Sequence, residues 1–353
     1  MENDEKWMRL ALQQAHQADY QTWQNPRVGA VIVKDQQLVS VGHTHQFGGF
    51  HAERDAISRA VPEQLAGATL YVTLEPCNHY GKQPPCTQLI VEAGIKRMVV
   101  AETDPHSIVR GKGIQYLRDH DIEVTTGVLA DEASTINAHY NHYFHTHRPW
   151  ITLKQAISLD GKVAFRQGKR TRITNDAVYH FVHRERAWFH GIMIGSQTAI
   201  IDNPLLTVHV KTTFPPVRIV IDRRGRLANH RHLKLLQTTL AKTWVFSSNR
   251  RLSHALSKTH AEVIILADCS IKQVIKECGR RGLQSLYVEG GPTLQQSLVD
   301  EDLVDEVITY VSPQFVGKQG VAGVQIPTTR MLATNVKLLD SNIRIEGKVT
   351  ENV

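Results

Sequence analysis

The sequence predicts an α/β protein built from two domains. The chain has 353 residues, of which 41% are hydrophobic, so it can bury a large core and exceeds the usual length of a single domain. In the first half, short apolar runs typical of strands alternate with segments of helical periodicity, and the second half repeats this alternation with strands of its own. We therefore expect two sheets, each with its own helices.

The elements of the first half follow from periodicity and turn residues. Residues 5–18 are expected to form a helix with one apolar stripe, Trp7, Leu10, Ala11 and Ala15, which we interpret as core contacts. Apolar runs on both sides of the polar residues 34–37 favour a hairpin. Further helices are expected at residues 51–60, 86–94 and 113–121, and strands at residues 28–35, 37–43, 68–74, 96–102 and 122–129. This domain should end near residue 145.

The domain boundary is predicted within a His-rich segment, residues 139–150. Pro149 ends a helix there, which gives domains at residues 1–147 and 148–353. No carboxylate or thiol accompanies the histidines of this segment, so we interpret them as a solvated helix face rather than a metal site: His139, His142, His145 and His147. Strands of the second half are expected at residues 150–158, 191–195, 217–222, 243–248, 262–266 and 285–290, in a mostly parallel sheet.

Composition and charge exclude several classes of protein. No apolar run is long enough to cross a bilayer, and the start MENDEK lacks the layout of a secretory signal, so we expect a soluble, cytoplasmic protein without a membrane partner. Four cysteines are too few for a disulfide framework here, which favours metal ligands or buried thiols. The net charge of +7 favours acidic partners, either nucleic acid or phosphorylated small molecules. Because Lys and Arg are scattered, we favour a small phosphorylated substrate and no nucleic acid. We also expect a homo-oligomer.

Four residues at the ends of neighbouring elements predict a zinc centre. A catalytic zinc ion takes three protein ligands and leaves one position for water, and His51, Cys77 and Cys86 supply that number of donors. Glu53 follows the histidine by two residues, where a carboxylate can lie beside the metal without binding it and shuttle a proton. A helix that starts at Cys86 favours its anionic form. His79 is a spare donor that we expect to face substrate or solvent.

Each part of this pattern is weak alone, because His-x-Glu is common and a buried cysteine is usually a small apolar residue. Together, His-Ala-Glu on a helix, a strand, Glu-Pro-Cys and a second cysteine after Pro-Pro are similar to the zinc-dependent nucleobase and nucleotide deaminases. A structural zinc ion, or no metal, is the alternative. The cysteines are separated by eight residues, NHYGKQPP, rather than by the two of the general signature.

Further segments extend the resemblance over nearly the whole chain. The inserted loop, NPRVGAVIV (25–33) and DPHSIVRGKG (104–113) resemble the deaminase half of the bifunctional riboflavin biosynthesis family. LKQAISLDGKVA (153–164), GSQTAIIDNPLLTVH (195–209) and YVEGGPTLQQSLV (287–299) resemble its reductase half. The resemblance implies a cytidine-deaminase-like mixed sheet with helices, then a dihydrofolate-reductase-like α/β domain. It implies hydrolytic deamination of 2,5-diamino-6-hydroxy-4-(5-phosphoribosylamino)pyrimidine, followed by reduction of the ribosyl chain to ribityl with NADPH.

The resemblance also assigns residues by position. Zn²⁺ would be held by His51, Cys77 and Cys86, with Glu53 as the proton shuttle. Independently, a Gly-Gly turn before a helix lets backbone approach a phosphate closely. By position, NADPH would contact Ala156, Arg172, Thr198, Asp202, Gly291, Pro292, Thr293, Leu294, Gln295, Gln296 and Ser297. The pyrimidine nucleotide would contact Asn25, Arg170, Arg186, Leu206, His209 and Glu289.

Several residues depart from the usual pattern of the family. Arg170 and Arg172 replace a serine and a tryptophan, and His209 replaces an arginine. We expect the two arginines to supply the phosphate contact that His209 makes only weakly. The alternative is a reductase domain that has lost its function. The other departures are Thr44 for a histidine, His106 for an asparagine and Arg223 for a small hydroxyl residue.

Two functions from other classes remain open. A tRNA or other nucleic-acid deaminase would share the zinc residues, but the sequence lacks an aromatic-rich basic stretch for stacking bases. A noncatalytic scaffold with structural zinc would have no use for Glu53 as a proton shuttle. Asn25 also has an alternative, since it suits the turn before Pro26.

Overall fold

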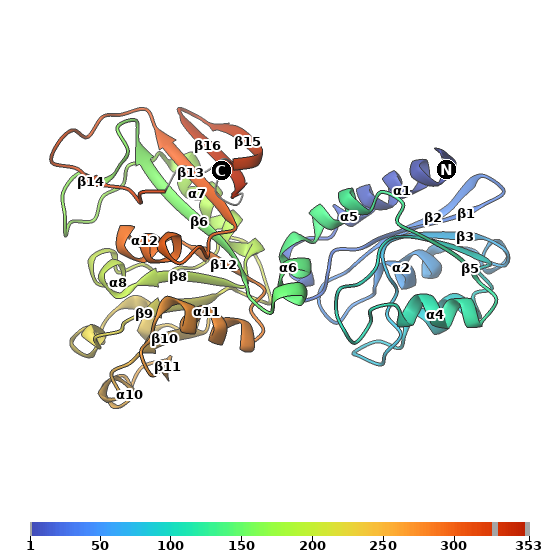
Figure 1. Cartoon of the computed structure of the whole chain (residues 1–353), viewed down its shortest axis with the longest axis horizontal. Coiled ribbons are helices and arrows are strands. Elements are labelled where there is room, and N and C mark those ends of the chain that lie inside the picture. The colour runs from blue at the N-terminus through green and yellow to red at the C-terminus, as the bar shows by residue number, and fades with distance from the viewer. Residues whose placement is uncertain (1, 327–330, 350–353) are drawn as a thin grey trace. The chain divides into compact units, whose positions relative to one another are not determined.

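The computed structural model describes residues 2–326 and 331–349 of the chain. The chain divides into two compact units, residues 1–146 and residues 147–353 (Figure 1). Each unit contains one large sheet with helices packed against it. Within the described residues, no helix combines the length and the apolar character needed to cross a membrane.

The first unit is built on a five-stranded mixed sheet of order β2-β1-β3-β4-β5. Its strands are β1 (Gly29–Lys34), β2 (Gln37–His43), β3 (Thr69–Leu74), β4 (Arg97–Glu102) and β5 (Glu123–Thr126). β1 is antiparallel to β2 and β3, whereas β3, β4 and β5 are parallel. The predicted hairpin is confirmed, and its turn residues Asp35 and Gln36 have φ angles of +50° and +64°, as a tight type I′ turn requires.

Helices cover both faces of this sheet because alternate residues of β1 are buried on opposite sides. Ala30 and Ile32 pack with α2 (Ala52–Arg59), α3 (Cys86–Glu92) and α4 (Lys112–Asp119). Val31 and Val33 pack with α1 (Glu2–Ala15) and α5 (Ala130–Ile136). The unit also contains α6 (Ala138–Thr146) and the 3-10 helices η1 (Tyr20–Thr22) and η2 (Pro62–Gln64). The sheet is therefore buried on both sides, and its strand ends are the places left for a site.

The second unit is built on a nine-stranded sheet of order β11-β10-β9-β8-β12-β6-β13-β16-β15. The first seven strands in this order are parallel, which confirms the mostly parallel sheet. β16 is antiparallel to both of its neighbours, β13 and β15. The strands are β6 (Trp150–Ser158), β8 (Gly191–Gly195), β9 (Val217–Ile221), β10 (Thr243–Ser247), β11 (Ala261–Ile265), β12 (Ser285–Val288), β13 (Glu306–Ser312), β15 (Met331–Leu339) and β16 (Asn342–Val349). β7 (Lys162–Ala164) and β14 (Val321–Ala322) form a separate two-stranded sheet.

Helices also pack on both faces of the second sheet. α11 (Ile271–Arg280) and α12 (Pro292–Asp300) contribute to one core cluster. A second cluster contains residues of α8 (Ser196–Asp202), η4 (Arg226–Asn229), α9 (Lys234–Gln237) and α10 (Arg251–Ala255). A third contains residues of α7 (Asp176–Glu185) and Phe189, which follows η3 (Arg186–Trp188). Because the central strands are parallel, their carboxyl ends share one edge of the sheet, which is where ligands bind in such folds.

The main differences from the expected elements lie at boundaries and in unpredicted segments. The first helix ends at Ala15, because Asp19 accepts a hydrogen bond from the N–H of Gln21 (2.8 Å) and starts η1 instead. Within the expected stripe of α1, Trp7, Ala11 and Ala15 are buried and Leu10 is only partly buried. α5, α7, β13, β15 and β16 lie in segments for which the sequence predicted no element.

We expect a fragment that ends at residue 147 to fold alone, because the elements of the first unit bury their apolar residues against one another. The fragment should unfold cooperatively by circular dichroism and retain zinc as the full chain does. Limited proteolysis of the full chain should cut between residues 140 and 150. An insoluble fragment, together with a full chain that resists cleavage there, would mean that the two halves share a core.

Candidate metal centre

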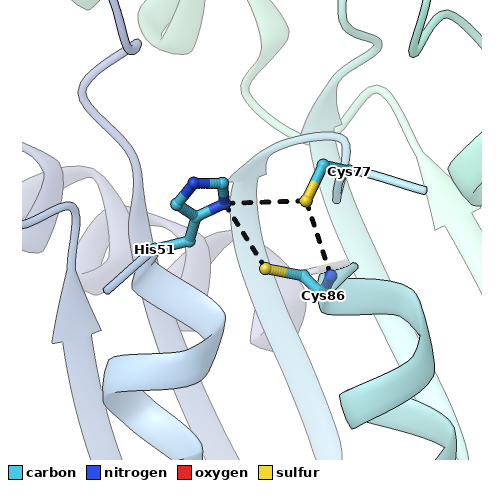
Figure 2. Close-up of side chains that lie close together, drawn as sticks. All are labelled: His51, Cys77 and Cys86. Atoms are coloured by element: carbon cyan, nitrogen blue, oxygen red, sulfur yellow. Dashed lines mark hydrogen bonds between the residues drawn. The ribbon is translucent and has the colours of Figure 1, made fainter. Parts of the chain in front are cut away.

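Three side chains from separate elements meet beyond the end of β3 (Figure 2). His51 directly precedes α2, Cys77 lies in the loop after β3, and Cys86 is the first residue of α3. Nδ1 of His51 lies 3.6 Å from Sγ of Cys77 and 3.5 Å from Sγ of Cys86. All three donor atoms lie within 4.8 Å of one another. The structure therefore brings the predicted ligand set together.

Local packing fixes these three positions. α2 approaches β2 so closely that a side-chain carbon on Gly42 would lie 2.4 Å from the carbonyl oxygen of Ala52, so only glycine fits. This contact sets where α2, and with it His51, begins. The N–H of Cys86 donates to Sγ of Cys77 at 3.4 Å, which closes the loop between the cysteines. Pro85 is extended, with φ −54° and ψ 134°, and starts α3 at the next residue.

The electrostatics of the cluster suit a cation. Hydrogen bonds from Cys86 and His51 hold the pKa of the Cys77 thiol well below its usual value, although burial opposes this. The hydrogen bond to Cys77, together with burial, raises the pKa of Cys86, so Cys77 ionises first. A second thiolate in this buried position needs a positive charge beside it, which a metal ion supplies. One nitrogen and two sulfur donors form the ligand set of a zinc site with one position left for water.

Glu53 lies in the first turn of α2 and is 4% exposed. Burial raises the pKa of its carboxyl group to about 7, and the charge of His51 opposes the shift. A carboxyl group with a pKa near neutrality can both accept and release a proton. Among the described residues, the clustered donor atoms are those of the histidine and the two cysteines, so Glu53 stands beside the ligand set rather than in it.

The segment around Thr44 differs from the family pattern in a way the structure explains. The Thr44 hydroxyl accepts a hydrogen bond from a backbone N–H at 3.0 Å and so supports the strand. The flanking histidines both face Asp55: Nδ1 of His43 lies 3.8 Å and Nε2 of His45 lies 3.1 Å from its carboxylate oxygens. Asp55 was not predicted as a site residue, although an acidic residue on the buried face of a short helix indicates a polar partner.

Two further predicted residues lie in loops. The N–H of Asn25 donates to the carbonyl oxygen of Thr22 at 3.1 Å, as a turn residue does. Its side chain makes no hydrogen bond within the described part of the chain, which leaves it available to a ligand. Nδ1 of His79 is buried without a hydrogen-bond partner in the same part of the chain.

A second candidate site lies at the carboxyl ends of β8 and β12. A side-chain carbon on Gly290 would lie 2.7 Å from Cα of Ile194, so only glycine fits between the strands. The N–H of Gly291 donates to Oγ1 of Thr198 in α8 at 3.0 Å. Because this N–H is used and Pro292 has none, Thr293 carries the first N–H that α12 offers to a ligand. The backbone surface here suits a phosphate.

Several side chains of the predicted cofactor-binding run hold α12 in place. Nε2 of Gln295 donates to the carbonyl oxygen of Lys154 at 2.7 Å, and Leu294 packs against the core. Nε2 of Gln296 also donates to the carbonyl oxygen of Gln325 at 3.2 Å, which ties the helix to a later segment. Within α12, Nε2 of Gln296 donates to Asp300 and the Ser297 hydroxyl donates to the Leu294 carbonyl, both at 2.8 Å. Ala156 pairs with Tyr310 across β6 and β13 and packs against the core there.

Arg186 and Glu289, both predicted substrate residues, form a buried bidentate ion pair. Nε of Arg186 lies 2.5 Å and Nη2 lies 2.9 Å from the two carboxylate oxygens. Burial alone would raise the pKa of Glu289, but Arg186 lowers it to about 2. Nη1 of Arg186 also donates to the carbonyl oxygen of Thr207 at 3.0 Å, next to Leu206. Leu206 is 4% exposed and has a φ of +52°, so this loop is tightly held.

His209 stacks on His183, with ring centres 3.6 Å apart and planes 11° apart. Burial, then Arg186 and His209, lower the pKa of His183 to about 4, so this ring is neutral at pH 7. The Tyr179 ring lies 4.5 Å from His183, and the Arg172 guanidinium lies 5.1 Å from the Tyr179 ring. Arg172 therefore reaches the margin of the cluster that contains His209.

The two replacement arginines have acidic neighbours. Nη2 of Arg172 lies 2.5 Å from a carboxylate oxygen of the exposed Asp176. Burial raises the pKa of Asp202, and the charge of Arg170 opposes that rise. Arg170 therefore lies near Asp202, a predicted cofactor residue, whereas Arg172 pairs with an exposed residue outside the predicted site.

Each half of the chain matches a known protein family. Residues 1–102 match the cytidine and deoxycytidylate deaminase zinc-binding region, and residues 149–347 match the RibD C-terminal domain. The chain thus joins a deaminase-type domain, with its zinc site at His51, Cys77 and Cys86, to a reductase-type α/β domain. The cytidine-deaminase-like and dihydrofolate-reductase-like folds expected from the sequence are confirmed.

The chain belongs to the RibD family of riboflavin biosynthesis proteins. It is 36% identical to riboflavin biosynthesis protein RibD of Aquifex aeolicus (strain VF5), over 100% of this chain and 96% of that protein. The structure of Acinetobacter baumannii RibD, form 1, is 33% identical and has a TM-score of 0.90 over 99% of both chains. A Thermotoga maritima diaminohydroxyphosphoribosylaminopyrimidine deaminase/5-amino-6-(5-phosphoribosylamino)uracil reductase is 34% identical, with a TM-score of 0.85 over 99% of both chains.

Proposed function

We propose that this protein catalyses two steps of riboflavin biosynthesis. The first unit removes an amino group from 2,5-diamino-6-hydroxy-4-(5-phosphoribosylamino)pyrimidine by hydrolysis. The second unit reduces the ribosyl chain of the product to ribityl with NADPH. The observation that carries the proposal is the cluster of His51, Cys77 and Cys86 with the buried Glu53 beside it, in a chain that resembles two-activity relatives over its whole length.

The deamination exchanges a ring amino group for an oxygen atom from water. A zinc ion held by His51, Cys77 and Cys86 would supply Lewis-acid activation of that water. Glu53 accepts the proton that the water loses as its oxygen bonds to the amino-bearing ring carbon. Glu53 then returns the proton to the amino nitrogen, which leaves as ammonia when its bond to carbon breaks. The buried carboxyl, with its raised pKa, suits both transfers.

The reduction adds a hydride to a ribosyl carbon and a proton to the neighbouring heteroatom. The nicotinamide cofactor supplies the hydride when bound. The close approach at Gly290 and the start of α12 leave backbone surface for the cofactor phosphates, and Thr198 fixes that turn. Arg186, held by Glu289, presents a fixed guanidinium to the polar groups of the substrate. The cytoplasmic location and homo-oligomeric assembly expected from the sequence form part of this proposal.

Alanine at Arg170 or Arg172 should weaken binding of the deaminated intermediate about tenfold at low ionic strength, because a guanidinium can donate two hydrogen bonds to a phosphate. The KM of the reduction should rise while kcat changes little, and the effect should shrink as salt screens these exposed charges. Asp176→Asn is the matched control: it frees Arg172 from its ion pair and should not raise KM. An unchanged KM in both arginine variants at low salt would mean that these arginines only face solvent.

Titrating NADPH by fluorescence, and following its oxidation with the deaminated product, tests the second activity. Saturable binding with oxidation is the expected result. Absence of both would leave the chain a deaminase with a vestigial second unit.

A further inference from the structure

A buried hydrogen-bond network in the second unit surrounds Glu185, the last residue of α7, whose side chain is 9% exposed. One carboxylate oxygen of Glu185 accepts hydrogen bonds from the hydroxyls of Tyr287 and Tyr310, the latter at 2.6 Å. The other oxygen accepts from Nε and Nη2 of Arg344 at 3.0 and 2.5 Å. Each oxygen therefore has two donors, which fill its acceptor positions and hold the carboxylate in one orientation.

The donors of this network come from three strands of the large sheet. Tyr287 lies in β12, Tyr310 in β13 and Arg344 in β16. Both tyrosines are fully buried, so their hydroxyls need an acceptor inside the protein. Burial and the charge of Glu185 raise the pKa of both hydroxyls, so both stay protonated and donate. The carboxyl end of α7 is thereby fixed to the sheet.

The network adjoins the ion pair of Arg186 and Glu289 on both sides. Arg186 directly follows Glu185 in the chain. Glu289 follows Tyr287 by two residues, so both side chains leave the extended backbone on the same face. Two successive links therefore join the end of α7 to the end of β12, first from Tyr287 to Glu185 and then from Arg186 to Glu289. The first link sets the separation of the two backbones at which the second forms.

We propose that the hydrogen bond from Tyr287 to Glu185 is a positioning contact for the reduction. It sets the geometry in which the pair of Arg186 and Glu289 meets the pyrimidine nucleotide. The inference rests on the proposed reductase function, and it names two residues that act on substrate binding through that pair. Hydrogen bonds weaken steeply as distance and angle depart from their preferred values. Without the first link, the ends of α7 and β12 can move apart, and the guanidinium no longer faces the substrate in one fixed orientation.

Tyr287→Phe tests this contact because it removes the hydroxyl and keeps the ring. In the full-length, zinc-loaded protein, the KM for the deaminated intermediate should rise about threefold to tenfold, the range that one hydrogen bond contributes. The kcat of the reduction should change less than KM, because folded molecules still complete the reaction once the substrate is bound. Ammonia release by the first unit of the same preparation should not change.

The matched control is Tyr310→Phe. This change removes an equally buried hydroxyl that donates to the same oxygen of Glu185, but from β13, which carries no member of the ion pair. Phenylalanine keeps the ring whose centre lies 5.6 Å from Nζ of Lys154. The unfolding temperatures of the two variants should fall by similar amounts, because each loses one buried hydrogen bond. The KM of Tyr310→Phe should stay within about twofold of the wild type.

The outcomes separate this inference from the proposed function. If the wild type reduces the intermediate, a KM that is unchanged in Tyr287→Phe, or raised at least as much in Tyr310→Phe, would overturn the inference. The network would then only stabilise the fold, and the reductase function would stand. A wild-type protein that does not reduce the intermediate with NADPH would overturn the reductase function and the inference with it.

Discussion

Replacing Cys86 with alanine should release the zinc ion and lower deaminase activity by about 10³-fold or more, because the activated water depends on the metal. Cys86 supplies one of the three clustered donor atoms, so its loss leaves two ligands where a catalytic zinc ion takes three. Zinc content and ammonia release are measured on the same preparation. Stripping the wild-type protein with a chelator should have the same effect, and added zinc should reverse it.

Cys278→Ala is the matched control for the loss of a buried thiol. Cys278 is fully buried in α11 of the second unit and has no part in the cluster. This variant should keep its zinc and its deaminase activity, even if the small cavity lowers its unfolding temperature. Full activity of the Cys86 variant at unchanged zinc content would refute the ligand assignment.

Glu53→Gln should keep zinc and substrate binding but slow deamination by at least about 10²-fold, the usual scale for loss of a general acid and base. Glutamine preserves the volume of the side chain and removes only its capacity to carry the proton. Single-turnover ammonia release, with substrate affinity measured in parallel, is the appropriate assay. A change of only a few-fold would reduce Glu53 to an ordinary carboxylate in the first turn of α2.

Glu75→Gln provides the comparison for that variant. Glu75 is also 4% exposed, but its carboxylate accepts hydrogen bonds from the backbone N–H groups of residues 104, 111, 113 and 114. Its replacement should lower the unfolding temperature, because those N–H groups lose a charged acceptor. The folded protein should still turn over within a few-fold of the wild type.

The zinc set could be predicted from the sequence because each ligand adjoins an element with a visible boundary. His51 precedes a helix, Cys77 follows a strand, and Pro85 starts the helix at Cys86. The hairpin was equally accessible, since its turn and alternating strands are local features. The zinc site and the hairpin both depend on a few neighbouring residues and on helices and strands that the apolar pattern already indicates.

Contacts between distant segments could not be predicted in the same way. Arg186 and Glu289 were both named as substrate residues, but their ion pair joins positions 103 apart and exists only because β12 lies between β8 and β6. The stack of His183 on His209 and the contact of His45 with Asp55 also depend on how loops pack. β13 pairs with β6, for example Glu306 with Thr152, which lie 154 positions apart in the sequence, so no local pattern indicated its place.

The most direct test of the two-step activity is mass spectrometry of the products formed from the aminopyrimidine nucleotide. With zinc-loaded protein alone, we predict one product in which an amino group has been replaced by oxygen, together with ammonia. Adding NADPH should convert that product to a second one that has gained hydrogen in its sugar chain, and NADPH should be consumed in equal amount. A zinc-loaded protein that leaves the nucleotide unchanged, or that never reduces the deaminated product in the presence of NADPH, would contradict the proposal.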